Sequence, residues 1–366
     1  MTNKPNKRAW TTLVLLWLGL MFLLFAGDGQ ANAQDAIPEV VVKGLNNPSG
    51  VAIQPNTGHV FVSDSGAGRV VRVIDGEIED VITGFPTEGY GTNPTYKIGP
   101  LGLLFLDENT LVVGGGGLPD GDDLIRVFKV PVVGERAIQV AEVQASESQA
   151  VEKTGKSKSP ELAQLSLPST EQMPGEGNFY GLALGTEKLF VTCNGDDNKG
   201  WVAQANVASN RKVTKLTRLI ATKEATGVDA PVAATISPQG YLVIGQMGEI
   251  KDLNDSLLTF YSQAGRKLGV YKTGLNDITG LAYGPQHNRL FALDFNWASP
   301  KQGGLYKLVD MKSETQCEAV LMSRLEKPTA LAFTAKGDCY ITLAGTNGNP
   351  DGELVLIRQL DIDPNP

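Results

Sequence analysis

Short runs of apolar residues, each bounded by glycine, proline, asparagine or aspartate, recur along the chain from residue 38 to residue 361. Six of these runs open with a glycine or an alanine, and a turn joins each of them to a second run of strand-forming residues. A third run follows in every unit and a fourth in most, so four strands recur in roughly 50 residues. The pattern predicts an all-β chain of six propeller blades, whose first strands are residues 50–53, 102–105, 181–184, 233–236, 280–283 and 330–333.

The two ends of this repeat region complement each other. The last unit has three strands and ends after Leu360, whereas residues 39–43 form a strand that belongs to no unit of its own. A ring closed by strands from both ends has no open sheet edge to template aggregation. The small residues that open the first strands agree with a ring, because six such strands crowd around one axis. We therefore expect one domain over residues 38–361, a six-bladed β-propeller closed by its N-terminal strand.

One interval between blades, from residue 102 to residue 181, is longer than the others. Within it, residues 145–177 are rich in Ser, Glu, Lys, Gln and Pro. This composition buries too little apolar surface to offset the entropy cost of ordering the chain. We expect a flexible polar insertion between blades 2 and 3, which is either an inert loop or a lid over a site.

The first 33 residues have the order of a secretory signal peptide. Lys4, Lys7 and Arg8 precede an apolar run over residues 13–26, and a small-x-small cleavage signature follows at residues 31–33. The apolar run is too short to cross a bilayer core of about 30 Å, so we expect cleavage and no membrane span. The mature chain would then begin near Gln34 and be exported, to the periplasm or outside the cell.

The three cysteines are an odd number for an oxidising compartment. Cys317 and Cys339 are close in sequence and are the candidates for a disulfide, which would close a loop of about 20 residues. Cys193 stands apart. The alternative is three buried free thiols, because spacing alone does not establish pairing.

The net charge of the chain limits the classes of partner that it can bind. The formal net charge is −8, which disfavours nucleic acid as a partner. Acidic residues gather in the loops between the second and third strands of the blades, where they outnumber lysines. In a propeller these loops share one face with the segments that link consecutive blades, so we expect an acidic loop face.

Candidate ligand-binding residues fall in these loops. Carboxylates, amides and aromatic rings converging on a pocket suit a neutral polyhydroxylated or cationic molecule, or a divalent cation such as calcium. The competing interpretation is that Asn, Asp and Gly are simply the residues of turns. We expect a monomer that binds a small polar molecule or a protein through residues Asp64, Asn178, Tyr180, Asn194, Asp229, Asp294 and Trp297.

One further loop has the alternation of a calcium-binding loop, with oxygen side chains at Asn347, Asn349 and Asp351. Arg358 occupies the position where such a loop has a bidentate acid, so a hydrogen-bonded hairpin turn is the competing interpretation. The only histidines, His59 and His287, fall in turns of the opposite face. This placement argues against a histidine-bound zinc or a histidine base on the acidic face.

Residues 44–53, 59–64 and 69–73 resemble an NHL repeat, with the sequences GLNNPSGVAI, HVFVSD and RVVRV. Weaker copies cover nearly all of residues 38–361, and the chain is similar to six-bladed propellers of the gluconolactonase and strictosidine synthase-like families. The resemblance implies the fold. In the gluconolactonase family, a Glu, two Asn and an Asp hold a divalent metal over the axis, commonly beside the glycine that opens a first strand. The residues at those positions here are Ser49, Leu101, Tyr180, Val232, Thr279 and Thr329.

Two functions follow as expectations. The first is an exported propeller that binds a small polar ligand or a protein partner on its acidic face. The alternative is a metal-dependent hydrolase of the lactonase type, in which a bound cation polarises a carbonyl or activates water. In that case the cation would lie among Asp64, Asn178, Asn194, Asp229 and Asp294. The soluble quinoprotein sugar dehydrogenases have a similar propeller with a histidine base, for which this chain offers no histidine on the active face.

Overall fold

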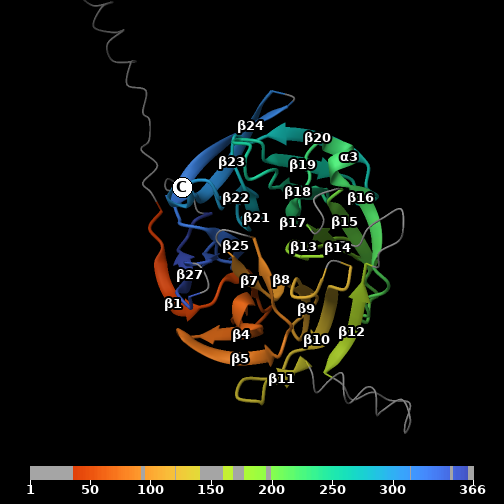
Figure 1. Cartoon of the computed structure of the whole chain (residues 1–366), viewed down its shortest axis with the longest axis vertical. Coiled ribbons are helices and arrows are strands. Elements are labelled where there is room, and N and C mark those ends of the chain that lie inside the picture. Colours follow the sequence, from red (N-terminus) through yellow and green to blue (C-terminus); the bar gives the residue numbers. More distant parts are fainter. Residues whose placement is uncertain are drawn as a thin grey trace, which may run out of the picture. The chain divides into compact units, whose positions relative to one another are not determined.

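The computed structural model describes residues 36–91, 95–119, 121–140, 160–167, 177–194, 199–313, 315–346 and 349–361. They form six blades, each of four antiparallel strands, around a central axis (Figure 1). In each sheet the first strand lies next to the axis and the fourth lies at the rim. The predicted six-bladed propeller is confirmed.

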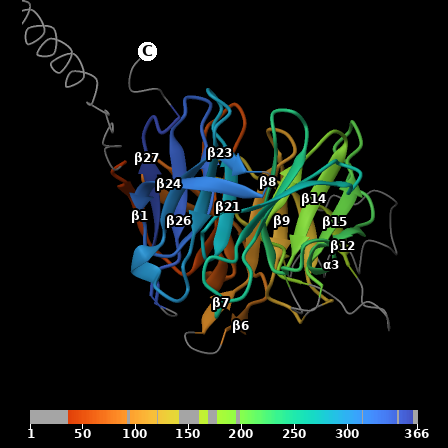
Figure 2. The same ribbon diagram turned by 90° about the horizontal axis from the view of Figure 1, so that it is seen from above.

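Blades 1 to 3 occupy the first half of the ring. Their strands are β2 (Pro48–Ile53), β3 (Val60–Asp64), β4 (Arg69–Ile74) and β5 (Glu77–Thr83); β8 (Pro100–Phe105), β9 (Thr110–Gly115), β10 (Leu124–Lys129) and β12 (Glu161–Ser166); and β13 (Leu182–Leu184), β14 (Lys188–Cys193), β15 (Trp201–Asn206) and β16 (Thr217–Ala221). A short helix, α3 (Thr222–Thr226), follows β16. The link between blades 1 and 2 contains a small hairpin of β6 (Glu88–Tyr90) and β7 (Tyr96–Ile98), which extends beyond the ends of the blades (Figure 2).

Blades 4 to 6 complete the ring. Their strands are β17 (Pro231–Ile236), β18 (Leu242–Gln246), β19 (Leu257–Tyr261) and β20 (Lys267–Lys272); β21 (Ile278–Tyr283), β22 (Leu290–Asp294), β23 (Gly304–Ser313) and β24 (Gln316–Arg324); and β25 (Pro328–Phe333), β26 (Cys339–Leu343), β27 (Gly352–Ile357) and β1 (Glu39–Leu45). One residue pair joins β20 to β24 and merges blades 4 and 5 into one eight-stranded sheet.

The ring closes as predicted. The N-terminal strand β1 pairs antiparallel with β27, which places Val40 opposite Val355 and Val42 opposite Leu354. Val42 packs into a core cluster with residues of blades 1 and 6. The last blade is therefore built from both ends of the described chain.

The small residues of the first strands are required by close approach of neighbouring blades. A β-carbon at Gly50 would overlap the carbonyl oxygen of Leu101 in blade 2, and one at Gly102 would overlap the carbonyl oxygen of Tyr180. Side-chain hydroxyls also bond neighbouring blades near the axis. Thr279 Oγ1 donates to the carbonyl oxygen of Pro328 at 2.8 Å, and Thr329 Oγ1 donates to that of Pro48 at 2.7 Å.

The structure differs in two ways from the flexible insertion expected over residues 145–177. Residues 161–166 form β12, the outer strand of blade 2, where Glu161 makes a buried ion pair with Arg126 at 2.8 Å. The chain also leaves blade 2 between its third and fourth strands, and β11 (Ile138–Gln139) pairs with β5 of blade 1 on the way. The polar composition of a rim strand hid β12 from sequence reasoning. Residues 145–159 and 168–176 lie outside the described residues.

Of the two alternatives for the cysteines, the structure has unbridged thiols, and the candidate disulfide between Cys317 and Cys339 does not form. Cys317 lies in β24 of blade 5 and Cys339 in β26 of blade 6, and all three cysteines are buried thiols outside any disulfide. Burial raises the pKa of the Cys317 thiol to about 11. The predicted signal peptide lies outside the described residues, and no described helix is long and apolar enough to cross a membrane.

Candidate functional site

A pocket lies over the axis, where the loops between second and third strands meet the segments that link consecutive blades. This upper pocket has a cavity volume of about 50 Å³ and opens to solvent. None of the described residues that line it carries a charge. The lining consists of Asn47, Ser49, Tyr96, Ile98, Tyr180, Asn194, Val232, Met247, Thr279, Phe295, Trp297 and Thr329.

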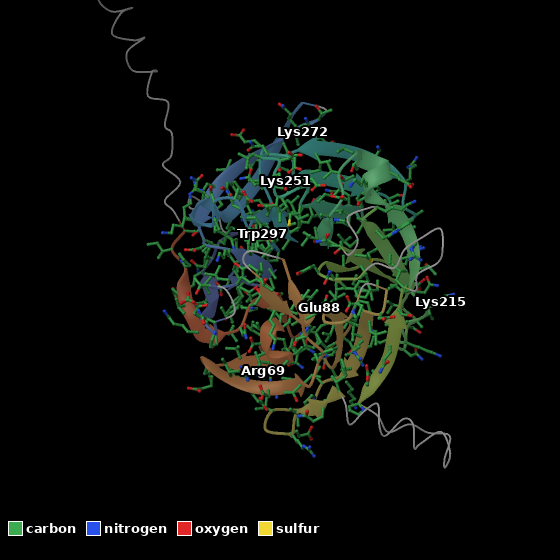
Figure 3. All side chains as sticks on the ribbon, viewed as in Figure 1. Arg69, Glu88, Lys215, Lys251, Lys272 and Trp297 are labelled. Atoms are coloured by element: carbon green, nitrogen blue, oxygen red, sulfur yellow. The ribbon has the colours of Figure 1, made fainter. Side chains whose placement is uncertain are left out.

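Three aromatic rings form one wall of the upper pocket. Tyr96 comes from β7 in the link between blades 1 and 2, whereas Phe295 and Trp297 follow β22 of blade 5. The Tyr96 and Trp297 ring centres are 5.4 Å apart, and those of Phe295 and Trp297 are 4.6 Å apart. In Figure 3, Trp297 lies toward the centre of the ring, far from Lys215 at the rim. The β6–β7 hairpin thus places the Tyr96 ring against the Trp297 ring of blade 5.

The backbone of the hairpin is held beside the axis by blade 1. Asn47 Nδ2 donates to the carbonyl oxygen of Lys97 at 2.9 Å, and the Gly99 N–H donates to Ser65 Oγ at 2.8 Å. The Lys327 ammonium lies 5.6 Å from the centre of the Tyr96 ring, within the range of a cation–π contact. These contacts fix Tyr96 at the pocket wall.

Tyr96 carries a polar group that none of the described residues satisfies. The residue is 3% exposed, and among the described residues its buried hydroxyl has no hydrogen-bond partner. A buried hydroxyl without a partner costs free energy, so such groups are rare in folded proteins. A ligand that accepts or donates a hydrogen bond here would remove that cost.

A second cavity lies along the axis next to the upper pocket. This axial cavity has a volume of about 100 Å³ and is lined by the first strands, including the small residues Gly50, Gly102, Gly181, Ala234, Gly280 and Ala330. Both cavities share the lining residues Ser49, Tyr180, Val232, Thr279 and Thr329. The axial cavity also has no charged residue among its described lining.

Asp64, expected to bind a ligand, instead braces the entry of blade 1. Its carboxylate accepts hydrogen bonds from the Asn46 N–H at 2.6 Å and from Arg69 at 2.8 Å. Burial raises the pKa of Asp64, against the lowering effect of these two partners. Its side chain is hydrogen-bonded to the backbone and to an arginine on the neighbouring strand, and it does not line the pocket.

Asp294 plays the same part in blade 5. It accepts from the Asp277 N–H at 2.8 Å, and Asp277 in turn accepts from the Trp297 N–H at 2.6 Å. Burial raises the pKa of Asp277 to about 7, and the nearby Asp294 and Asp255 add to the shift. The two carboxyl groups hold the loop that presents Trp297, although neither lines the pocket.

The other predicted residues divide between the pocket and the scaffold. Tyr180, Asn194 and Trp297 line the upper pocket, whereas Asp229 is paired with Lys223 at 2.6 Å. Asn178 is buried beside Asn194, with its Nδ2 3.5 Å from the Asn194 carbonyl oxygen. The structure therefore brings three of the seven predicted ligand-binding residues to one pocket.

The acidic residues expected to hold a divalent cation have partners within the protein. Among the residues that the structure describes, no three His, Cys, Asp or Glu side chains gather closely enough to hold a metal ion. Of the predicted calcium loop, Asn347 lies outside the described residues and Asn349 is exposed. Asp351 accepts from the N–H and the hydroxyl of Thr346, and these hydrogen bonds lower its pKa. The loop has the hydrogen bonding of a turn.

Sequence reasoning missed the apolar half of the pocket. Phe295, Met247 and Ile98 line it but were not candidates. Phe295 and Met247 each come directly after the end of a second strand, in loops that we expected to be acidic and solvated. Large apolar side chains in such loops are the signal that was available.

No family model matches the chain, and no curated protein matches it. Solved structures do. A glucose dehydrogenase has a TM-score of 0.56 at 14% identity, covering 88% of this chain and 99% of its own. Regucalcin, a calcium-binding protein from Agrobacterium tumefaciens, has a TM-score of 0.53 at 11% identity, with coverages of 88% and 93%. A gluconolactonase from Xanthomonas campestris has a TM-score of 0.51 at 12% identity, with coverages of 89% and 92%.

At these identities the likeness concerns the fold alone. It shows that the chain shares the β-propeller fold of these proteins, which the NHL-like repeats predict.

Proposed function

We propose that the protein is an exported propeller that binds an uncharged small molecule in the upper pocket, with an apolar ring of the ligand against the aromatic wall. The observation that carries this proposal is the wall of Tyr96, Phe295 and Trp297 in a pocket whose described lining is uncharged. The buried Tyr96 hydroxyl, which has no hydrogen-bond partner among the described residues, adds to it. Concave, mostly apolar pockets with a few polar groups are typical of small-molecule sites. Export rests on the signal-like residues 1–33.

The lining favours a neutral ligand over the cation that an acidic face would select. An ion in this pocket would lose its hydration without gaining an opposite charge from the described lining. The rings of Tyr96, Phe295 and Trp297 offer faces and edges against which a ligand ring packs at a favourable offset. Asn47 and Asn194 add amide groups for orientation.

Lactone hydrolysis through a bound metal is the competing function. Its support is the fold of the gluconolactonase and of regucalcin. In this chain Asp64, Asp229 and Asp294 are committed to Arg69, Lys223 and backbone N–H groups. A metal-dependent step would have to release those carboxylates, so binding without metal is the better-supported proposal.

The test is calorimetric titration of the folded protein with 2-naphthol, a neutral ring with one hydroxyl. We expect saturable binding that Trp297→Ala abolishes and that added calcium or EDTA leaves unchanged. Tyr96→Phe should weaken binding about threefold to tenfold, the value of one hydrogen bond. The matched control is Tyr241→Phe, because Tyr241 is exposed in the turn before β18. No binding of 2-naphthol, or metal-dependent lactone turnover that Tyr96→Phe leaves intact, would overturn the proposal.

A further inference from the structure

We infer that the ligand has two unlike parts, an apolar ring in the upper pocket and an uncharged, hydroxylated head in the axial cavity. This inference rests on the proposed function and names the class of molecule that the site takes. It follows from the way the two cavities join and from the different chemistry of their walls.

The two cavities adjoin at a shared belt of residues. Ser49, Thr279 and Thr329 line both cavities, and each hydroxyl donates to a backbone carbonyl, that of Ser49 within its own segment and those of the two threonines in a neighbouring blade. A hydroxyl oxygen that donates its proton keeps acceptor capacity. Ser49 and Thr279 therefore present acceptors at the point where a ligand would pass from one cavity to the other.

The axial cavity is polar although its side chains are small. Its first strands form a ladder on one side only, as β2 does with β3 and β21 with β22. The lining of this cavity is more polar than apolar, and its glycine and alanine side chains do not supply that polarity, so main-chain groups face the cavity. Some carbonyl groups of these strands already accept hydrogen bonds, as those of Pro48 and Pro328 do from Thr329 and Thr279. Buried main-chain N–H and C=O groups require partners. A hydroxylated head supplies both donors and acceptors along such a wall.

The upper pocket has the opposite character, because Tyr96, Phe295 and Trp297 cluster with Met247 and Ile98 in its lining. Burial of an apolar ring there is favourable, whereas burial of a sugar-like head is not. Neither cavity has a charged residue in its described lining, so a carboxylate or an ammonium on the head would be desolvated without compensation. The geometry selects a neutral amphiphile.

Ala330 offers a way to separate the two parts. It lines the axial cavity but not the upper pocket, so Ala330→Leu adds bulk only where the head would lie. Ala234 occupies a corresponding place in blade 4, and Ala234→Leu serves if Ala330→Leu does not fold. Ala208→Leu is the control for added apolar bulk, because Ala208 is exposed in a turn of blade 3.

The experiment compares three probes with the same ring by calorimetry: 2-methoxynaphthalene, 3-(2-naphthyloxy)propane-1,2-diol and 2-naphthoxyacetate. We expect the diol to bind about tenfold more tightly than the methoxy compound, as two added hydrogen bonds would give, and the anion to bind most weakly. Ala330→Leu should reduce the affinity for the diol to that for the methoxy compound and leave the latter unchanged. Ala208→Leu should change neither.

The outcomes separate the two claims. If no naphthyl probe binds, the proposed function fails. If the methoxy compound and the diol bind equally, and Ala330→Leu and Ala234→Leu change neither, the two-part ligand is refuted while ring binding stands. If the anion binds best, the head is charged and the inference is equally refuted.

Discussion

Replacing Asp277 by asparagine is expected to stabilise the protein above neutral pH and to leave it nearly unchanged at about pH 4. Asp277 is 2% exposed, and its Oδ2 accepts the Trp297 N–H at 2.6 Å. Asparagine keeps a carbonyl oxygen for that hydrogen bond and has no charge to desolvate. The substitution therefore removes the cost of a buried carboxylate and retains its contact.

The size and sign of the effect follow from the pKa of Asp277, which burial raises from 3.8 to about 7. Between these values the folded state holds a proton that the unfolded state has lost, so wild-type stability falls as the pH rises through this window. A difference of about three units at 1.36 kcal/mol each amounts to about 4 kcal/mol once both states are ionised. The gain of Asp277→Asn should grow from near zero at about pH 4 to about 4 kcal/mol above pH 7.

Urea unfolding of both proteins at several pH values from 4 to 8.5 measures this difference directly. The control is Asp75→Asn, because Asp75 is an exposed turn residue and its replacement should change stability by less than about 0.5 kcal/mol at every pH. A stability difference for Asp277→Asn that stays constant with pH would refute the reasoning. So would a variant that is less stable than the wild type at pH 8.

Three further outcomes test the fold. Glu161→Gln should cost about 3 to 5 kcal/mol in urea unfolding, because it leaves the Arg126 charge buried without its partner. Gly50→Ala should cost about 1 to 3 kcal/mol or more, measured by thermal melting, because the added methyl group overlaps the Leu101 carbonyl. The three cysteines should react with Ellman's reagent only after unfolding, since all are buried and the pKa of Cys317 is raised to about 11.

The ring was predictable because its evidence is repeated along the chain. Each first strand opens with a small residue, and the physical reason is the same at Gly50 and at Gly102, where the next blade leaves no room for a β-carbon. The strand β12 was not predictable from composition, because a strand at the rim exposes much of its surface and therefore has a polar composition. Only its register against β10, which sets Glu161 beside Arg126, shows that it belongs to blade 2.

The site was harder to predict because a residue type does not reveal its partner. Asp64 lies directly opposite Arg69 across the turn from β3 to β4, so the sequence held enough information to assign that pair. Asp294 reaches the backbone of Asn276 and Asp277 in the segment before β21, and that contact depends on how blade 5 pairs. Counting carboxylates on the loop face therefore overestimated the charge available to a ligand.

The same hydrogen bonds explain why an acidic loop face surrounds a neutral pocket. A carboxylate at the end of a second strand accepts the N–H groups of the segment that enters its own blade, as Asp64 and Asp294 both do. Once the loop is anchored there, the residues that follow the carboxylate are free to turn toward the axis, and in blade 5 these are Phe295 and Trp297. The β6–β7 hairpin supplies Tyr96 to complete the wall. In this propeller the aspartate side chains fix the loop backbones by hydrogen bonds, and the apolar residues next to them line the pocket and determine which ligand it accepts.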